Sequence, residues 1–191
     1  MSRLKELYEN QIRPELQKEL NCSNYNQVPS IQKVVINTGV GRAVENKKEL
    51  EEAVNYLKQI SGQQPVTTTA KKSIAGFHLR KGMAIGCRVT LRRIRMYEFL
   101  DKLFNIVLPR TRDFRGLDLK GLDGHGNYSL GITEQTAFLE INPNEVNKIL
   151  SLQITIVTST SSDQEGELLL RKLGCPLKSE EQETNTSTDR I

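Results

Sequence analysis

The stretch AIGCRVTLR, residues 84–92, decides the fold because its side chains alternate between two chemistries. The odd positions are apolar: Ile85, Cys87, Val89 and Leu91. The even positions are small or basic: Ala84, Gly86, Arg88, Thr90 and Arg92. Alternation with a period of two is typical of a strand that buries one side and leaves the other in water. The stretch therefore predicts a half-buried β-strand.

The same alternation recurs in three other stretches, LQITIVT (152–158), NYSLGI (127–132) and SIQKVVINTGVG (30–41). In the last of these, Val35 interrupts an otherwise regular pattern in which Lys33 and Asn37 oppose Val34 and Ile36. A shorter Thr-rich stretch, PVTTTA (65–70), completes a set of five predicted strands. A sheet with one packed side and one open side explains all of these patterns.

Four stretches have apolar residues at helical spacing, around residues 4–20, 50–60, 95–109 and 168–173. Pro14 should kink or divide the first helix, and Pro109 should end the third. Asn46 with Glu49, and Ser162 with Glu165, have the spacing of capping boxes at the starts of the second and fourth. Gly62 and Gly174 are suited to end those two helices.

Interspersed helices and strands predict an α+β fold, with a mainly antiparallel five-stranded sheet backed by helices. A chain of 191 residues with 37% hydrophobic residues can bury one ordinary core. We assign residues 1–178 to a single domain. Residues 179–191 are acidic, rich in Ser and Thr and without periodicity, which predicts a disordered tail.

Basic residues are concentrated in the middle of the chain. Residues 1–65 contain 9 Lys and Arg against 8 Asp and Glu, a balance of +1. Residues 66–116 contain 12 against 3, or +9, and residues 117–191 contain 6 against 12, or −6. One central segment therefore supplies the basic character that the total of +4 understates.

The predicted open side of the sheet has the chemistry of a nucleic-acid contact. Arg88, Thr90 and Arg92 lie on it, and the neighbouring loop adds Lys71, Lys72, Arg80 and Lys81. Short polar and basic side chains offer donors to phosphates and riboses. An open sheet side that is merely solvated is the alternative. An aromatic content of 5% argues against stacked single strands, and no helix-turn-helix pattern indicates DNA, so structured RNA is favoured.

No motif indicates catalysis, a metal site or a cofactor. The stretch TGVGRAV (38–44) lacks the third glycine of a dinucleotide fingerprint and is better explained by a tight turn with positive φ at Gly39 or Gly41. His78 and His125 are far apart, and the three cysteines form no C-x-x-C pair. No apolar run is long enough to span a membrane, and no targeting signal is visible.

Several segments together resemble bacterial-type ribosomal protein five of the large subunit, the family that carries 5S ribosomal RNA. They are INTGVG (36–41), SGQQP (61–65), TTTAKKSIAGFHLRKGMAIGCRVTLR (67–92), RMYEFLDKL (95–103), LPRTRDFRGL (108–117) and DGHGNYSLGITEQ (123–135). They occur in the order and spacing of that family. The resemblance covers residues 1–178, and the tail extends beyond what most bacterial members have.

The resemblance implies a helix-backed sheet whose concave open side grips 5S rRNA in the central protuberance. It assigns 5S contacts to Lys33, Asn37, Gln63, Thr90 and Arg92, and the alternation adds Arg88. It also implies that a loop reaches P-site tRNA, with Lys71, Lys72, Ser73, His78, Arg80 and Lys81 close to it. Loops between Arg110 and Pro143 are the candidates for an intersubunit bridge to small-subunit ribosomal protein thirteen. Other central-protuberance proteins and 23S-type rRNA are further implied partners.

The expected location is the large ribosomal subunit, in the bacterial cytoplasm or the plastid stroma. Two other classes compete with this function. An RNA-modifying enzyme would need a nucleophile, metal or cofactor motif, and a module that binds only proteins would leave the +9 segment unexplained.

Overall fold

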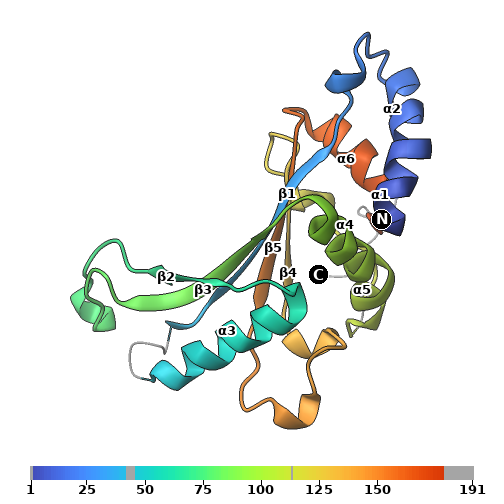
Figure 1. Cartoon of the computed structure of the whole chain (residues 1–191). Helices are drawn as coiled ribbons and strands as arrows, with labels where there is room; N and C mark the ends of the chain where they lie inside the picture. The colour runs from blue at the N-terminus through green and yellow to red at the C-terminus, as the bar shows by residue number, and fades with distance from the viewer. Residues whose placement is uncertain (1, 42–45, 113, 179–191) are drawn as a thin grey trace, which may run out of the picture.

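The computed structural model describes residues 2–41, 46–112 and 114–178. Five strands form one antiparallel sheet in the order β2-β3-β1-β5-β4 (Figure 1). The strands are β1 (Ile31–Gly39), β2 (Val66–Thr69), β3 (Ala84–Leu91), β4 (Tyr128–Ile132) and β5 (Leu152–Thr158). The helices are α1 (Arg3–Leu7), α2 (Arg13–Glu19), α3 (Lys47–Ser61), α4 (Arg93–Lys102), α5 (Leu108–Arg110) and α6 (Asp163–Lys172). The predicted α+β class and antiparallel sheet are confirmed.

Strand β1 lies at the centre of the sheet and aligns the apolar residues of its neighbours. Ile36 is paired with Val89 of β3 and with Ile154 of β5, and all three side chains are buried. Ile154 is paired in turn with Leu130 of β4. Antiparallel pairing places directly opposite side chains on the same side of a sheet, so the register collects these residues into one core.

Each of the two long helical rods contains a π-helical turn just before a proline. Residues Tyr8–Ile12 join α1 to α2, and residues Leu103–Val107 join α4 to α5. Pro14 and Pro109 follow, and the residues four positions before them lie inside these π-turns. A wider turn relieves the clash between a proline ring and that earlier carbonyl. Pro14 therefore changes the hydrogen bonding of its helix without dividing it, and the second rod continues one residue past Pro109.

Neither predicted capping box is complete, because one of its two bonds forms at α3 and neither forms at α6. Asn46 caps α3 by accepting a hydrogen bond from the Lys48 amide (3.2 Å), but the Glu49 carboxylate binds the Lys148 ammonium (2.6 Å) instead of turning back. Ser162 is the N-cap residue of α6 but makes no side-chain cap bond. Glu165 accepts a hydrogen bond from the Thr160 hydroxyl instead. In α3 the glutamate binds a residue far away in the chain, whereas in α6 it binds Thr160, two residues before the capping Ser162.

The predicted positive φ at Gly39 or Gly41 is wrong, because neither glycine adopts it. Glycine is required instead at Gly86 of β3, which is paired with Gly39 of β1. A Cβ atom on Gly86 would come within 2.5 Å of the Thr38 carbonyl oxygen. The close approach of β3 to β1 at this point therefore excludes a side chain.

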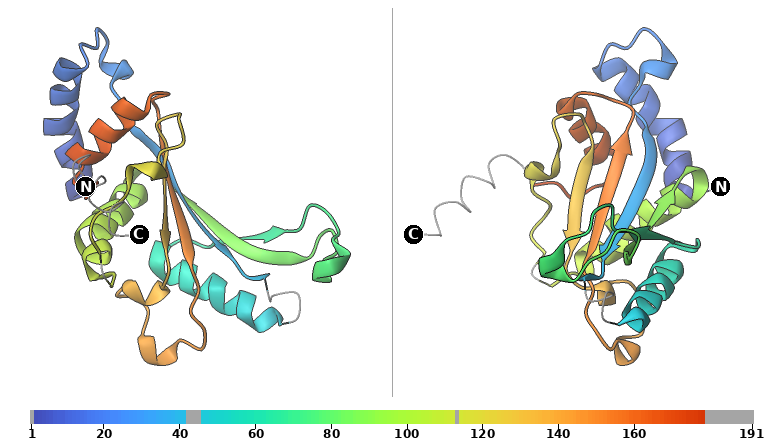
Figure 2. Two further views of the ribbon diagram at one scale, coloured as in Figure 1. Left: turned by 180° about the vertical axis from the view of Figure 1, so that it is seen from behind. Right: turned by 90° about the vertical axis from the view of Figure 1, so that its left-hand side faces the viewer.

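The helices lie on one side of the sheet. Figure 2 shows α1, α2, α4 and α6 behind the sheet when β4, β5 and β1 face the viewer, with α3 beside it. The hairpin of β2 and β3 extends away from the helical side. The apolar core fills the space between sheet and helices, where Tyr8, Leu57 and Leu100 are buried. No helix among the described residues is long and apolar enough to cross a membrane. The predicted tail lies outside the described residues.

Substituting alanine for Gly86 tests the close strand approach. Gly86→Ala should lower the free energy of unfolding by about 1–3 kcal/mol, because the backbone of β1 must shift to make room. Gly131→Ala in β4 is the matched control, since nothing lies within 4 Å of its added Cβ. Its stability should stay within about 0.5 kcal/mol of the unchanged protein. Urea unfolding measures both, and equal stabilities of the two variants would contradict this account.

Candidate nucleic-acid interface

The side of the sheet that faces away from the core carries a grid of side chains fixed by strand register. We call this grid the open face. One row crosses all five strands through Val66, Arg88, Asn37, Gln153 and Gly131. The next row contains Thr90, Val35, Thr155 and Ser129, and Lys33 beside Val157 follows. The open face thus combines polar, basic and a few apolar side chains.

The rows bring together the residues that the sequence assigned to RNA. Asn37 lies directly opposite Arg88, and Thr90 stands two residues farther along β3. Val34 is paired with Leu91, so Lys33, which precedes Val34, and Arg92, which follows Leu91, flank the same end of the antiparallel β1–β3 pair. Arg88 and Arg92 are exposed, whereas Lys33, Asn37 and Thr90 are half-buried by their neighbours.

Gln63 joins this group from a different element. It follows Gly62, the left-handed residue that ends α3. Its side-chain amide donates a hydrogen bond to the Thr90 carbonyl oxygen (3.2 Å). One of its two amide hydrogens is therefore used within the protein, while its carbonyl oxygen remains an acceptor. Gln63 acts at least partly by fixing the edge of β3.

The sequence analysis assigned no RNA contact to the polar residues of β4 and β5. Gln153 is exposed, and the hydroxyls of Ser129 and Thr155 hydrogen-bond to each other at 3.0 Å. The alternation in LQITIVT and NYSLGI already placed these residues opposite the core. The open face is also less polar than expected, because Val66 is 63% exposed and Val35 is half-buried there.

The loop between β2 and β3 is closed by its own backbone. Ile74 and Leu79 exchange backbone hydrogen bonds at 2.9 and 3.1 Å, and the Lys81 amide donates to the Ser73 hydroxyl at 2.9 Å. Gly82 also donates to the Ala70 carbonyl oxygen. The residues that the sequence assigned to this loop are all exposed: Lys71, Lys72, Ser73, His78, Arg80 and Lys81. The tip presents Phe77, which is 73% exposed.

Cations of the two sides of the molecule differ in their partners. On the helical side, Lys172 pairs with two glutamates of α2 and Lys102 pairs with Glu140. The stretch from residue 53 to 97 contains no acidic residue. Among the described residues, no carboxylate pairs with any cation of its basic part, which comprises Lys71, Lys72, Arg80, Lys81, Arg88, Arg92, Arg93 and Arg95. Their positive charge is thus available to an external anion.

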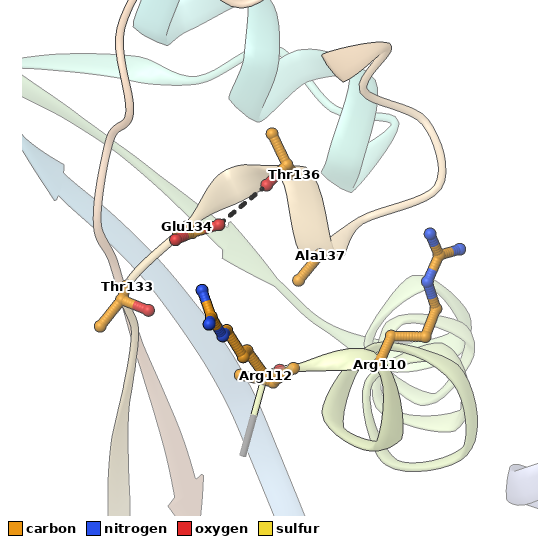
Figure 3. Close-up of a pocket in the computed structure, with 7 residues that line it drawn as sticks. Arg110, Arg112, Thr133, Glu134, Thr136 and Ala137 are labelled. Carbon is orange, nitrogen blue, oxygen red and sulfur yellow. Dashed lines mark hydrogen bonds between the residues drawn. The ribbon is translucent and has the colours of Figure 1, made fainter. Parts of the chain in front are cut away.

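A polar hollow of about 150 Å³ lies between the end of α5 and the loop after β4 (Figure 3). Its lining includes Arg110, Arg112, Thr133, Glu134 and Thr136. The Thr136 hydroxyl donates to Glu134 at 3.4 Å. The lining contains neither a histidine nor a cysteine. The hollow is suited to holding a polar side chain of a partner.

Among the described residues, no cluster of three or more His, Cys, Asp or Glu side chains could hold a metal ion. The histidines are not brought together, because His78 lies in the loop of the β2–β3 hairpin and His125 lies before β4. Burial raises the pKa of the Cys87 thiol to about 11 and that of Cys175 to about 12. Both thiols are therefore neutral at pH 7 and poor nucleophiles.

Comparison with known families identifies both halves of the chain. A model described as "Ribosomal protein L5" matches residues 24–80, and a model for the C-terminus of that ribosomal family matches residues 84–177. Proteins named large ribosomal subunit protein uL5 match nearly the whole chain. The one from Geotalea daltonii is 55% identical over 178 residues, which cover 93% of this chain and 99% of that protein. The one from Geobacter sulfurreducens is 56% identical with the same coverage.

A relative from a different bacterial genus agrees with these. The uL5 protein of Leuconostoc citreum is 57% identical over 173 residues, covering 91% of this chain and 96% of the relative. The class is therefore that of structural, non-enzymatic constituents of the large ribosomal subunit. Within that class, the chain belongs to the ribosomal protein L5 family. The resemblance seen in the sequence is confirmed at this level.

The hydrogen bond from Gln63 yields a test of its structural share. Gln63→Ala should lower the free energy of unfolding by about 1 kcal/mol, because the Thr90 carbonyl loses its side-chain partner. Thr90→Val keeps that carbonyl and its partner, and should change stability by less than about 0.5 kcal/mol. Urea unfolding compares the two. A Gln63→Ala variant as stable as the unchanged protein would show that the hydrogen bond contributes nothing to the fold.

Proposed function

We propose that this protein binds 5S rRNA in the central protuberance through its open face. The supporting observation is the set of cations without carboxylate partners on and beside β3. RNA phosphates carry a dense negative charge, and Lys and Arg that neutralise them release condensed counterions. Cations already paired with carboxylates would gain less, so the lack of such pairs among the described residues near β3 favours an external anion as the partner.

The geometry of the open face favours structured RNA. Its residues are short apart from Lys33, Arg88, Asn37 and Gln153, so an RNA helix can approach the strands closely. Hydroxyls such as those of Thr90 and Thr155 suit ribose and phosphate oxygens. The face carries no aromatic side chain in the rows that register defines, which disfavours stacked single bases. We therefore assign 5S contact to Lys33, Asn37, Gln63, Arg88, Thr90 and Arg92.

We assign the loop of residues 71–81 to P-site tRNA. It lies at the far end of the β2–β3 hairpin, away from the helical side of the molecule (Figure 1). Its four cations, Lys71, Lys72, Arg80 and Lys81, are exposed, and its backbone is closed by hydrogen bonds. A basic loop held in one shape and projected from the body is suited to reach a second RNA. The contact is proposed from the family resemblance together with this placement.

The segment 110–143 is our candidate for the bridge to small-subunit ribosomal protein thirteen. It contains all seven residues that line the polar hollow of Figure 3, and also the exposed Leu139. An exposed leucine and a polar hollow in one segment combine an apolar contact with hydrogen-bond partners, as protein interfaces do. Other central-protuberance proteins and 23S-type rRNA are proposed as further neighbours.

Mutation should separate the two RNA-binding surfaces. Lys33→Ala with Arg92→Ala should abolish most binding of the isolated protein to 5S rRNA and make the remainder less salt-dependent. Changing Lys71, Lys72, Arg80 and Lys81 together to Ala should weaken 5S binding only modestly, through the lost long-range field. Ribosomes assembled with that loop variant should hold P-site tRNA less tightly. Filter binding at several salt concentrations and tRNA dissociation rates measure these effects.

A charge-matched control accompanies the sheet variant. Lys18→Ala with Lys120→Ala also removes two cations, both exposed and neither on the open face. This control should bind 5S rRNA almost as tightly as the unchanged protein. The division between the two surfaces is wrong if the loop variant loses 5S binding as completely as the sheet variant does.

We propose that residues 1–178 form the working domain and that the tail is dispensable for it. Deleting Ser179–Ile191 should leave the melting temperature and 5S affinity nearly unchanged, because the segment has no apolar periodicity to bury. Its removal takes away acidic residues, so binding should, if anything, tighten slightly. Calorimetry and filter binding provide the test. A drop of several degrees would mean that the tail packs against the domain.

A further inference from the structure

The chain passes from β3 into α4 without an intervening loop. Strand β3 ends at Leu91, and Arg92 is still extended, with φ −141° and ψ 162°. The next residue, Arg93, has φ +55° and is the first residue assigned to α4. The change from strand to helix is therefore made at Arg93. We call the residues Arg92, Arg93, Ile94 and Arg95 the β3–α4 corner.

The backbone at Arg93 favours a different residue. In the left-handed region the Cβ atom of an L-residue is crowded by the backbone, so Gly adopts it without strain and Asn tolerates it well. Arginine has neither advantage, so the left-handed conformation is unfavourable for it. A residue held in a disfavoured conformation is a reason to look for a role of its side chain.

The positive charge of the side chains at the corner indicates what that role is. Arg92, Arg93 and Arg95 are exposed, and among the described residues none of them pairs with a carboxylate. Lys102, at the end of the same helix, behaves differently. Its ammonium donates to the Ile60 carbonyl oxygen at 2.8 Å and pairs with Glu140. The corner therefore keeps three guanidinium groups available within four consecutive residues.

The corner continues directly from the open face. Val34 is paired with Leu91, so Lys33 and Arg92 flank the end of that strand pair, and Arg93 lies one residue beyond. On the other side, Arg95 borders a hollow with Gly62, next to Gln63. Glu98 also lines this hollow but forms no ion pair with Arg95. A polyanion lying on the open face can thus extend over the corner.

We propose that Arg93, supported by Arg95, is a second phosphate-binding point for the RNA that occupies the open face. Guanidinium groups bind phosphate oxygens through paired N–H donors, which fixes the backbone of the RNA at the point where it leaves the sheet. This inference rests on the proposed RNA function and extends it to residues beyond the sheet. It also explains why a left-handed position carries arginine rather than glycine.

The test replaces Arg93 by residues that suit its backbone. Arg93→Asn and Arg93→Gly should melt at or above the temperature of the unchanged protein. They should bind 5S rRNA roughly threefold to tenfold more weakly, with the slope of log affinity against log salt reduced by roughly one. Arg93→Lys keeps the charge but lacks the paired N–H donors, so it should restore the salt slope and part of the affinity. Lys18→Asn is the control, because it removes one exposed cation from α2 on the helical side.

The outcomes separate this inference from the proposed function. If the unchanged protein does not bind 5S rRNA, the proposed function itself fails. If it binds, and the Asn and Gly variants bind equally well with the same salt slope, only the role of Arg93 is overturned. The role is also overturned if Lys18→Asn weakens binding as much as Arg93→Asn, or if both Arg93 variants lose binding together with several degrees of melting temperature. Weaker binding at undiminished stability, partly restored by lysine, supports it.

Discussion

The pairing of β1 with β3 is the constraint on which the rest of the structure depends. It places Ile36 opposite Val89 in the core and Asn37 opposite Arg88 on the open face. A slip of one residue would exchange the two sides, burying Arg88 and exposing Val89. The close approach at Gly86, where a Cβ would meet the Thr38 carbonyl, helps to fix this register. Core and open face are therefore determined by the same set of backbone hydrogen bonds.

The division of charge follows from this two-sided sheet. On the helical side, ion pairs such as Lys172 with Glu15 and Glu19 link α2 to α6. Exposed pairs of this kind contribute little each, about 0–1 kcal/mol. Near β3 the described cations have no such partners, and their mutual repulsion lowers stability slightly. A protein that assembles with RNA recovers this cost when phosphates take the place of the missing carboxylates.

Much of the fold could be predicted because strands with one buried side reveal themselves by alternation. The pattern in residues 84–92 identified Cys87, Val89 and Leu91 as core residues, and all three are buried. The even positions of the same stretch, which include Arg88 and Thr90, were predicted to lie on the opposite side of the sheet. Pairing partners were not predictable, since alternation gives the side of a residue but not its neighbour. The row that joins Asn37 to Arg88 and Gln153 required the structure.

The wrong predictions concerned features that tertiary contacts determine. Glu49 has the spacing of a capping box, yet Lys148, ninety-nine residues away, competes successfully for its carboxylate. Gly39 and Gly41 suggested a tight turn, whereas the requirement for glycine arises from the approach of a second strand at Gly86. Local patterns cannot report such competition, because the competing group lies far away in the chain.

Arg93 shows the opposite case, in which the local sequence gives no sign of an unusual conformation. The run LRRIRM (91–96) has the pattern of the start of a basic helix, and nothing in it indicates a left-handed residue. The conformation is required because β3 and α4 must each pack their apolar residues, Leu91 and Met96, into the same core within five residues. Packing therefore decides the backbone at residue 93, while the exposed side chain at that position remains free to serve another purpose. The residues that we propose to bind RNA are those whose backbones are held by the core and whose side chains lie outside it.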